Sequence, residues 1–163
     1  MTVVSETWMD RRTWRAGPWD SEPDRVDWTD EASGYPCLML RNAFGVWCGY
    51  VAVPPGHPFH GRDHDAVDVR VHGRLTFAEP CMDGELPVAP RDRICHAPTS
   101  GEFHTVWWFG FDCGHVVDLM PMAFDLPISP LGERVYRDLD YVRAEITGLA
   151  AQLAALDARN EIR

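Results

Sequence analysis

Seven apolar residues recur along the C-terminal region with spacings that alternate between four and three residues. This spacing places the seven side chains on one stripe of an α-helix, because the helix makes 3.6 residues per turn. The sequence therefore predicts a long amphipathic helix over residues 133–158, with Pro130 at its approach, where proline is tolerated. The stripe consists of Val135, Leu139, Val142, Ile146, Leu149, Leu153 and Leu156.

The predicted helix is long for a chain of 163 residues. At 1.5 Å per residue it extends about 39 Å, which exceeds the width of a domain of this size. Two arrangements would cover its apolar stripe. Either the distal half pairs with a second copy of the chain in a homodimer, or the whole helix lies along a sheet and frays at its end.

The region of residues 35–113 carries short apolar runs that are typical of β-strands. Residues 36–41 and 44–53 form two such runs, and Asn42 with Ala43 supplies the connection between them. The sequence Pro-Pro-Gly directly after the second run ends it abruptly. We therefore expect two adjacent strands here.

Two further strands are predicted downstream. Residues 66–77 begin with valines that alternate with polar side chains, which is typical of a half-buried strand. After Gly73, Leu75-Thr76-Phe77 either continues this strand through a bulge or starts the next one. Residues 104–112 are aromatic on both faces, which favours an inner strand. Because the strands come first and the long helix last, the sequence predicts one α+β domain over residues 1–163, with an antiparallel or mixed sheet.

Residues 1–30 show neither a helical nor a strand period. Such a segment cannot form a core of its own, so we expect an irregular arm that lies over the main body and is anchored by its indole rings. The four tryptophans of this arm are Trp8, Trp14, Trp19 and Trp28.

The chain is acidic, with 25 Asp and Glu against 15 Lys and Arg and a formal net charge of −10. Because affinity for phosphate backbones is largely electrostatic, this charge argues against duplex nucleic acid and anionic membranes as partners. No run of residues approaches the roughly 18 apolar positions of a membrane span, and residues 1–12 are too charged for a signal peptide. We therefore expect a cytoplasmic protein.

The five cysteines are odd in number and widely spread, which favours reduced, buried thiols over disulfides. No cofactor is predicted, although Cys95 and His96 together with Cys113 and His115 offer the donor types of a zinc site. Their spacing lacks the paired cysteines that make a zinc prediction specific. The cysteines are Cys37, Cys48, Cys81, Cys95 and Cys113.

Two polar clusters interrupt the β region. The loop of residues 56–65 holds three histidines and two aspartates, which favours a solvated acidic loop over a metal cage, with His57 as its main functional candidate. The second cluster is His72, Arg74 and Thr76, which on one strand face would form a cationic and hydroxyl patch for a phosphate or carboxylate. The glycine beside His72 allows another backbone or a ligand to approach closely.

The third cluster ends the aromatic run WWFGFDCGH of residues 107–115. Strand alternation places Trp108 and Asp112 on one face and Cys113 on the other. An apolar wall that ends in Asp112, Cys113 and His115 suits acid–base or nucleophilic chemistry, because burial changes pKa values. The structural alternative has Cys113 in the core and Asp112 capping a turn.

Several motifs taken together resemble one protein family. They are CGYVAVPPGHP at residues 48–58, VHGRLTF at residues 71–77 and WWFGFDCGH at residues 107–115, with Pro36-Cys37-Leu38 before them. In these motifs the chain is similar to a family of small uncharacterised proteins of bacteriophages and their bacterial hosts. The resemblance covers residues 28–120 and part of the predicted helix. Arg74 departs from it, since glycine is expected there.

The resemblance implies an accessory protein that acts in the host cytoplasm when it is phage-encoded. It suits the handling of a nucleotide-derived signal of bacterial immunity, by sequestration or destruction. In the binding hypothesis Trp47, Tyr50 and Trp108 stack a planar group, while His57, His72 and Arg74 hold phosphate. A homodimer through the C-terminal helix would then join two such sites.

Two further hypotheses belong to other functional classes. In the enzyme hypothesis, Asp112, Cys113 and His115 act with His72 as a hydrolase of the phosphodiesterase or amidase type. In the third, the N-terminal tryptophans bind a protein partner. The catalytic candidates are thus His72, Asp112, Cys113 and His115, and the ligand-binding candidates are Trp47, Tyr50, His57, Arg74, Thr76 and Trp108.

Overall fold

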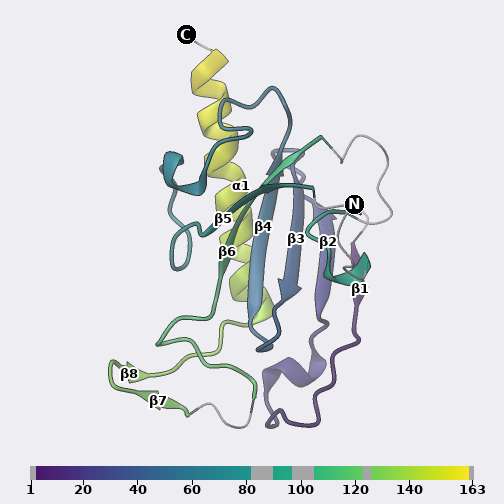
Figure 1. The fold of residues 1–163 in the computed structure, drawn as a ribbon, viewed down its shortest axis with the longest axis vertical. Coiled ribbons are helices and arrows are strands. Elements are labelled where there is room, and N and C mark those ends of the chain that lie inside the picture. The colour runs from purple at the N-terminus through teal and green to yellow at the C-terminus, as the bar shows by residue number, and fades with distance from the viewer. Residues whose placement is uncertain (1–2, 82–89, 97–104, 123–125, 162–163) are drawn as a thin grey trace.

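The computed structural model describes residues 3–81, 90–96, 105–122 and 126–161. Within them, six strands form one sheet in which each neighbouring pair is antiparallel, and a single long helix lies against one face (Figure 1). The α+β prediction is therefore confirmed. In spatial order the strands are β1 (Val4–Glu6), β2 (Arg25–Thr29), β3 (Pro36–Arg41), β4 (Trp47–Val53), β6 (Trp107–Asp112) and β5 (Phe77–Pro80), and the helix is α1 (Leu139–Glu161).

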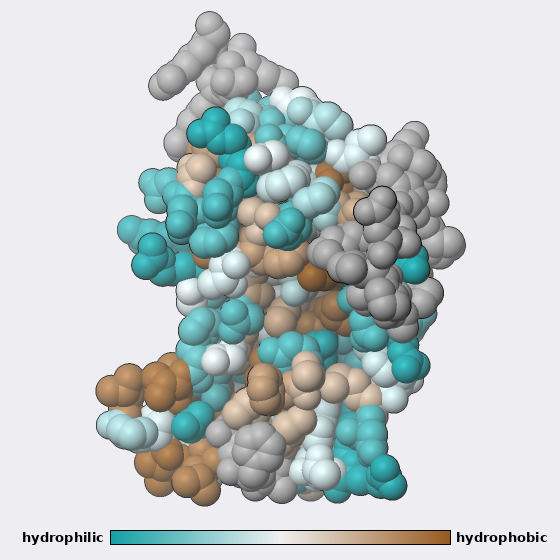
Figure 2. Space-filling model, viewed as in Figure 1, coloured by the Kyte–Doolittle hydropathy of each residue, from teal (hydrophilic) through white to brown (hydrophobic). Residues whose placement is uncertain are grey.

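The remaining elements are short and lie outside this sheet. The β7–β8 hairpin projects from the body, and Figure 2 shows apolar surface over it, where Leu126, Ile128 and Leu131 are largely exposed. These elements are η1 (Pro18–Ser21), η2 (His64–Ala66), η3 (Pro90–Asp92), β7 (Ile128–Ser129) and β8 (Gly132–Glu133).

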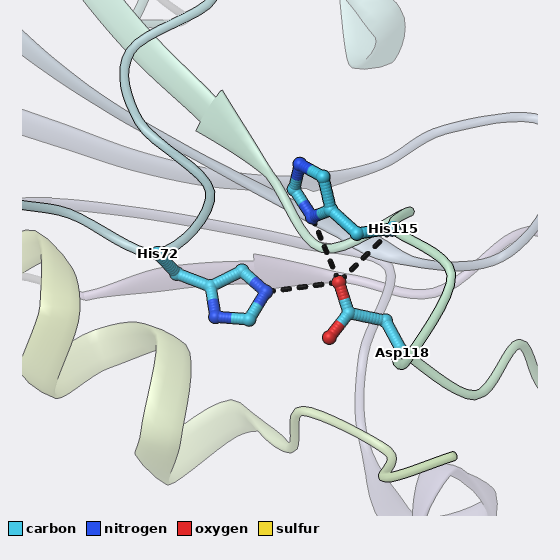
Figure 3. A group of neighbouring side chains, drawn as sticks. All are labelled: His72, His115 and Asp118. Atoms are coloured by element: carbon cyan, nitrogen blue, oxygen red, sulfur yellow. Dashed lines mark hydrogen bonds and ion pairs between the residues drawn. The ribbon is translucent and has the colours of Figure 1, made fainter. Parts of the chain in front are cut away.

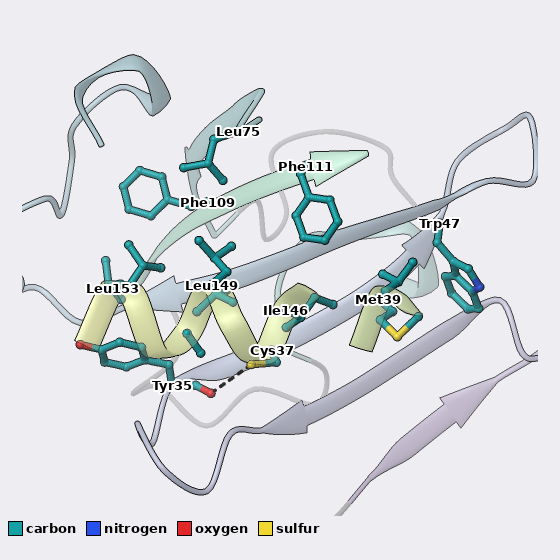
Figure 4. Close-up of a cluster of buried hydrophobic side chains, with 14 of the residues drawn as sticks. Tyr35, Cys37, Met39, Trp47, Leu75, Phe109, Phe111, Ile146, Leu149 and Leu153 are labelled. Carbon is teal, nitrogen blue, oxygen red and sulfur yellow. Dashed lines mark hydrogen bonds between the residues drawn. The ribbon is translucent and has the colours of Figure 1, made fainter. Parts of the chain in front are cut away.

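Alternation along the strands divides the core into two clusters, one on each face of the sheet. The helix-facing cluster includes Phe109, Phe111 and Cys113 of the aromatic run, whereas Trp108 belongs to the opposite cluster. The predicted alternation of this run is therefore confirmed. The helix contributes five fully buried residues, three of which are labelled in Figure 4: Val142, Ile146, Leu149, Ala150 and Leu153.

Glycines on paired strands let aromatic rings lie flat against the sheet. Gly49 on β4 pairs with Phe111 on β6, and an added Cβ at Gly49 would lie 2.6 Å from the Phe111 ring. On the other face Gly110 pairs with Tyr50, and an added Cβ there would lie 2.4 Å from the Tyr50 ring. These positions allow the close approach of rings to backbone that fixes the β4–β6 register.

The predicted helix start is wrong by six residues, because α1 begins at Leu139. Asp138 caps it, since its carboxylate accepts the amide N–H of Tyr141 at 2.8 Å. Val135 is instead exposed, in a bridge with Asp118. The buried stripe packs on the sheet, so the helix lies along it, and the homodimer remains a prediction.

The strand predicted from residue 66 onward is also wrong, because of residues 66–77 only Phe77 belongs to a strand, β5, in keeping with the alternative that a new strand starts there. Its alternation nevertheless predicted burial: Val67 is buried and Val69 packs against the helix-facing core, while Asp68 is exposed. The segment is extended beside the helix rather than in the sheet. Its backbone at Arg70 hydrogen bonds to the Gln152 side chain through both its N–H and its C=O.

The N-terminal segment is more ordered than predicted, since it contains β1 and the inner strand β2. Trp19 and Trp28 are buried as anchors. Asp24 fastens the arm, because its carboxylate accepts the amide N–H groups of Trp8 and Met9, each at 2.8 Å, and pairs with Arg11.

The expectation that all cysteines are reduced is wrong, because Cys81 and Cys95 form a disulfide with a Cα–Cα distance of 5.1 Å. The fold brings the end of β5 against residues 90–96, a contact that cysteine spacing does not reveal. Cys37, Cys48 and Cys113 are free and buried. Within the described residues, none of the helices has the length and apolar character needed to cross a membrane.

Candidate functional site

Two of the predicted catalytic residues, His72 and His115, lie together around an acidic residue that the sequence analysis did not select (Figure 3). Asp118 Oδ2 is 2.9 Å from His72 Nε2 and 2.9 Å from His115 Nδ1. The two imidazole centroids are 5.3 Å apart. One carboxylate oxygen thus joins imidazoles that are distant in sequence.

Asp118 is the buried centre of this group, with a fully buried side chain. Its Oδ2 also accepts the amide N–H of His115 at 3.0 Å, and its Oδ1 accepts a bond from Arg137 Nε at 3.0 Å. Burial acts to raise the pKa of Asp118, but the hydrogen bonds from His72, His115 and Arg137 outweigh it and hold the pKa well below its usual range. Asp118 is therefore a carboxylate at neutral pH.

Each imidazole has a second polar neighbour beyond Asp118. His72 Nδ1 lies 2.8 Å from the Tyr141 hydroxyl, on the first turn of α1. Burial of Tyr141 and its hydrogen bond to Glu145 raise the pKa of this phenol. His115 Nε2 lies 3.9 Å from Asp112 Oδ1, and both of these side chains are about one third exposed.

Local backbone structure sets the positions of both histidines. His72 lies in a turn closed by the Arg74 N–H to the Val71 C=O at 3.1 Å. Gly73 has φ +66°, and an added Cβ there would lie 2.1 Å from Cε1 of the His115 ring. Only glycine lets this turn rest directly on that ring.

His115 follows the end of β6, where a second turn forms. The Gly114 N–H donates to Asp112 Oδ1 at 2.9 Å, and the Asp118 N–H donates to the His115 C=O at 2.9 Å. The predicted capping of this turn by Asp112 is therefore present. Thr76 Oγ1 lies 3.4 Å from Asp112 Oδ2, so this ligand-binding candidate stands at the exposed edge of the group.

Cys113 does not join the cluster. Its side chain belongs to the helix-facing core, and burial followed by the charges of nearby carboxylates raises the pKa of its thiol. A nucleophilic cysteine needs a stabilised thiolate, which this environment disfavours. The structure therefore places Cys113 in the core, as the structural alternative to a nucleophile predicted.

The other ligand-binding candidates lie in different environments. His57 is buried, with its Nε2 2.8 Å from the Leu153 C=O. Trp47 is buried on the helix-facing side, whereas Tyr50 and Trp108 belong to the cluster on the opposite face. These aromatic side chains therefore do not form one wall, and His57 is not brought to His72.

The zinc set suggested by the sequence is not assembled. Cys95 is in the disulfide, and His96 Nε2 lies 2.7 Å from the Cys37 C=O, with its ring near Trp108. Within the described part of the chain, two groups have metal-ligand donors within 4.8 Å of one another. One is the exposed loop run Asp63, His64 and Asp65, and the other is His72, His115 and Asp118.

Sequence reasoning missed Asp118, Arg137 and Tyr141. The one local signal for Asp118 is its position three residues after His115, a spacing that a single turn can close. No protein-family model, curated protein or solved structure matches the chain.

Proposed function

We propose that the chain is a metal-dependent hydrolase, with a divalent ion held by His72, His115 and Asp118. The observation that carries this proposal is the position of Asp118 Oδ2, 2.9 Å from both His72 Nε2 and His115 Nδ1. Donors 2.9 Å apart would subtend roughly 90° at an ion 2.0–2.1 Å from each. Two imidazoles and one carboxylate in that arrangement leave the opposite coordination positions open.

The neighbours of the three donors support this proposal. An imidazole that binds a metal through one nitrogen must carry its proton on the other and donate it to a partner. His72 Nδ1 has the Tyr141 oxygen at 2.8 Å, and the Tyr141 proton can go to Glu145. His115 Nε2 faces the carboxylate of Asp112. His72 thus has an acceptor at hydrogen-bond distance, and His115 has a carboxylate 3.9 Å from its Nε2.

The proposed chemistry is hydrolysis by an activated water. A divalent ion polarises an ester or amide substrate and lowers the pKa of bound water toward about 7, so that hydroxide forms near neutral pH. The proton goes to solvent, because His115 is partly exposed and the group is open at that side. Zinc is the first ion to test, and manganese and iron(II) also suit these donors.

Sequestration of a nucleotide-derived ligand is the rival proposal, and the placement of the aromatic residues supports it less. Trp47 and Trp108 are fully buried and lie on opposite faces of the sheet, so neither offers an open stacking surface. Incubation with nucleotides separates the two proposals: a sequestering protein releases its ligand intact, whereas an enzyme forms product beyond one equivalent.

The test combines zinc binding with turnover. Metal-free protein is titrated with zinc by calorimetry, and the loaded protein is incubated with cyclic and linear nucleotides, with and without chelator. Zinc binding should be lost in His72→Ala and in Asp118→Asn, and turnover should require the ion. His64→Ala is the matched control, because His64 belongs to the other group of donors.

Three outcomes would overturn the proposal. Zinc affinity that falls in His64→Ala and not in His72→Ala would move the ion to the loop. Wild-type protein that binds no zinc, manganese or iron(II) would exclude the metal centre. Binding of zinc with all substrates recovered intact would exclude hydrolysis. Asp118→Asn keeps the volume of the side chain, and circular dichroism shows whether it folds.

A further inference from the structure

We propose that Arg74 determines the substrate class of this site, by binding an anionic phosphoryl group beside the metal ion. The inference rests on the proposed function and extends it to phosphate esters. Within the part of the chain that the structure describes, Arg74 is the one residue other than glycine with a positive φ, +75°. An L-residue in this region is strained, and such strain persists where the surrounding structure imposes it.

The backbone around Arg74 is fixed on both sides. Its N–H closes the turn to Val71, and Gly73 before it rests on the His115 ring. After it, Leu75 is buried and the Thr76 N–H donates to the Gly110 C=O at 2.9 Å. The chain therefore holds residue 74 in a conformation that suits glycine, yet arginine occupies it.

No side-chain hydrogen bond or ion pair between Arg74 and the described residues offsets this strain. The Arg74 side chain is exposed. Gly73 directly before Arg74 lies against the His115 ring, and His72 bonds to the shared carboxylate, so the backbone of residue 74 is held next to the donors of the proposed ion. A strained arginine without a side-chain partner, next to the proposed metal site, points to a ligand that the arginine binds.

The charge of the site favours an anion once an ion is bound. Asp112, Asp118 and Glu145 supply three carboxylates around the ligands, and Arg74 and Arg137 supply two guanidinium groups. A bound divalent ion changes the net charge of this set from negative to positive. The site can then attract an anion even though the chain has a net charge of −10.

A phosphodiester fits these features better than a neutral ester or amide. The planar guanidinium donates two parallel N–H bonds to phosphate oxygens, while the ion holds another oxygen. Hydroxide from the ion forms the new P–O bond, and the ester P–O bond on the opposite side breaks. The departing oxygen takes a proton from solvent, so one water is consumed and a phosphomonoester and an alcohol are formed.

The experiment compares an anionic with a neutral substrate on zinc-loaded protein. Bis(p-nitrophenyl) phosphate and p-nitrophenyl acetate are hydrolysed by wild type, Arg74→Gly and Arg74→Lys. We expect Arg74→Gly to lower kcat/KM for the phosphodiester about tenfold or more, mainly through KM, and to leave the acetate unchanged. Arg74→Lys should keep part of the affinity. Equal losses on both substrates, or no loss, would overturn the inference.

A structural role for Arg74 predicts the opposite change in stability. Glycine relieves the strain at φ +75°, so Tm should rise in Arg74→Gly while phosphodiester turnover falls. A lower Tm with the loss of turnover would contradict a substrate-binding role.

Phosphate binding separates this inference from the proposed function. Inorganic phosphate is titrated calorimetrically into wild type, Arg74→Gly and the control Arg12→Gly, which removes the same charge from an exposed pair with Asp10. Weaker binding in Arg74→Gly alone supports the role of Arg74 even when no substrate turns over. Equal binding in all three proteins, or binding in none, overturns it.

Discussion

Gly73 is the residue on which the geometry of the site depends most directly. Its φ of +66° and the 2.1 Å separation between an added Cβ and the His115 ring act together. Gly73→Ala should therefore displace His115 from Asp118 and weaken zinc binding about tenfold or more, as loss of a supporting contact does in metal sites. Calorimetric titration with zinc measures the change.

Gly34 provides the matched control for Gly73. It has a similar φ of +74°, but an added Cβ there would meet nothing within 4 Å. Gly34→Ala should lose about 1–2 kcal/mol of stability from left-handed strain and keep its zinc affinity. Equal zinc affinities in the two variants would show that the His115 ring does not depend on the turn at Gly73.

At this scale the sequence identified the histidines and missed their shared partner. His72 and His115 stood out because glycine and polar residues follow apolar runs at those positions. Asp118 lies in an unpatterned segment after β6, and its burial depends on Arg137 and the turn at His72. Such a partner is set by tertiary contacts, which local patterns do not encode.

At the scale of elements, periodicity predicted what each segment buries better than where the segment ends. The stripe on α1 is buried as predicted from Val142 to Leu153, yet its first apolar position, Val135, precedes the helix. Asp138 caps the helix, so the helix does not extend back to Val135 although the apolar spacing does. The valines of residues 67–71 likewise face the core from an extended segment, because a period of two describes the faces of a chain and not its hydrogen-bond partners.

The packing of α1 on β4 depends on the absence of a side chain at Gly49. An added Cβ there would lie 2.6 Å from the Phe111 ring and 2.8 Å from Ile146 Cγ1. We expect Gly49→Ala to lower the free energy of unfolding by about 1–3 kcal/mol, the usual cost of overpacking a core. Urea denaturation followed by tryptophan fluorescence measures it.

A glycine-to-alanine substitution on the other side of α1 should have the opposite effect on stability. Gly148 is an exposed helical residue, and an added Cβ would meet nothing within 4 Å. Gly148→Ala should raise stability by about 1 kcal/mol, because alanine loses less backbone entropy in a helix. A stabilised Gly49→Ala variant, or a destabilised Gly148→Ala variant, would contradict this placement of the helix.

The N-terminal arm should make stability depend on pH through Asp24. Burial acts to raise the pKa of Asp24, but hydrogen bonds from the amides of Met9 and Trp8 and from Arg11 outweigh it and lower the pKa. A lowered folded-state pKa gives stability that is present above the unfolded value, about 3.9, and lost as pH falls through the folded value. Asp24→Asn should cost about 3 kcal/mol at pH 7, because it leaves Arg11 without its carboxylate and Arg41 with Glu22 alone.

The pH profile of this variant is the measurement that checks the assignment. Urea unfolding between pH 7 and pH 3 should show a smaller fall in stability for Asp24→Asn than for wild type. The remaining fall includes Asp118, whose pKa is also lowered. Parallel profiles for the two proteins would show that Asp24 does not titrate differently in the folded chain.

Considered as a whole, the molecule is a sheet covered on both faces. The helix covers one face, while residues 90–96 lie on the other, where Arg25 donates to the C=O groups of Arg91, Arg93 and Cys95. The disulfide between Cys81 and Cys95 closes this second cover. Disulfides persist in oxidising compartments, so this bond argues against the cytoplasmic location, which stays a prediction.

The disulfide should supply a measurable part of the stability of the whole molecule. It joins residues 14 apart in sequence, and a loop of this size corresponds to about 3 kcal/mol through the entropy removed from the unfolded chain. The Cys81→Ser, Cys95→Ser double variant should lose about this amount in urea denaturation. Reductant should produce the same loss in wild type and no further loss in the double variant.

Thiol titration of unfolded, unreduced wild type should count three groups, Cys37, Cys48 and Cys113. A count of five, or a wild type whose stability reductant does not change, would show that the bond does not form and that residues 90–96 are held by non-covalent contacts such as those of Arg25 and His96.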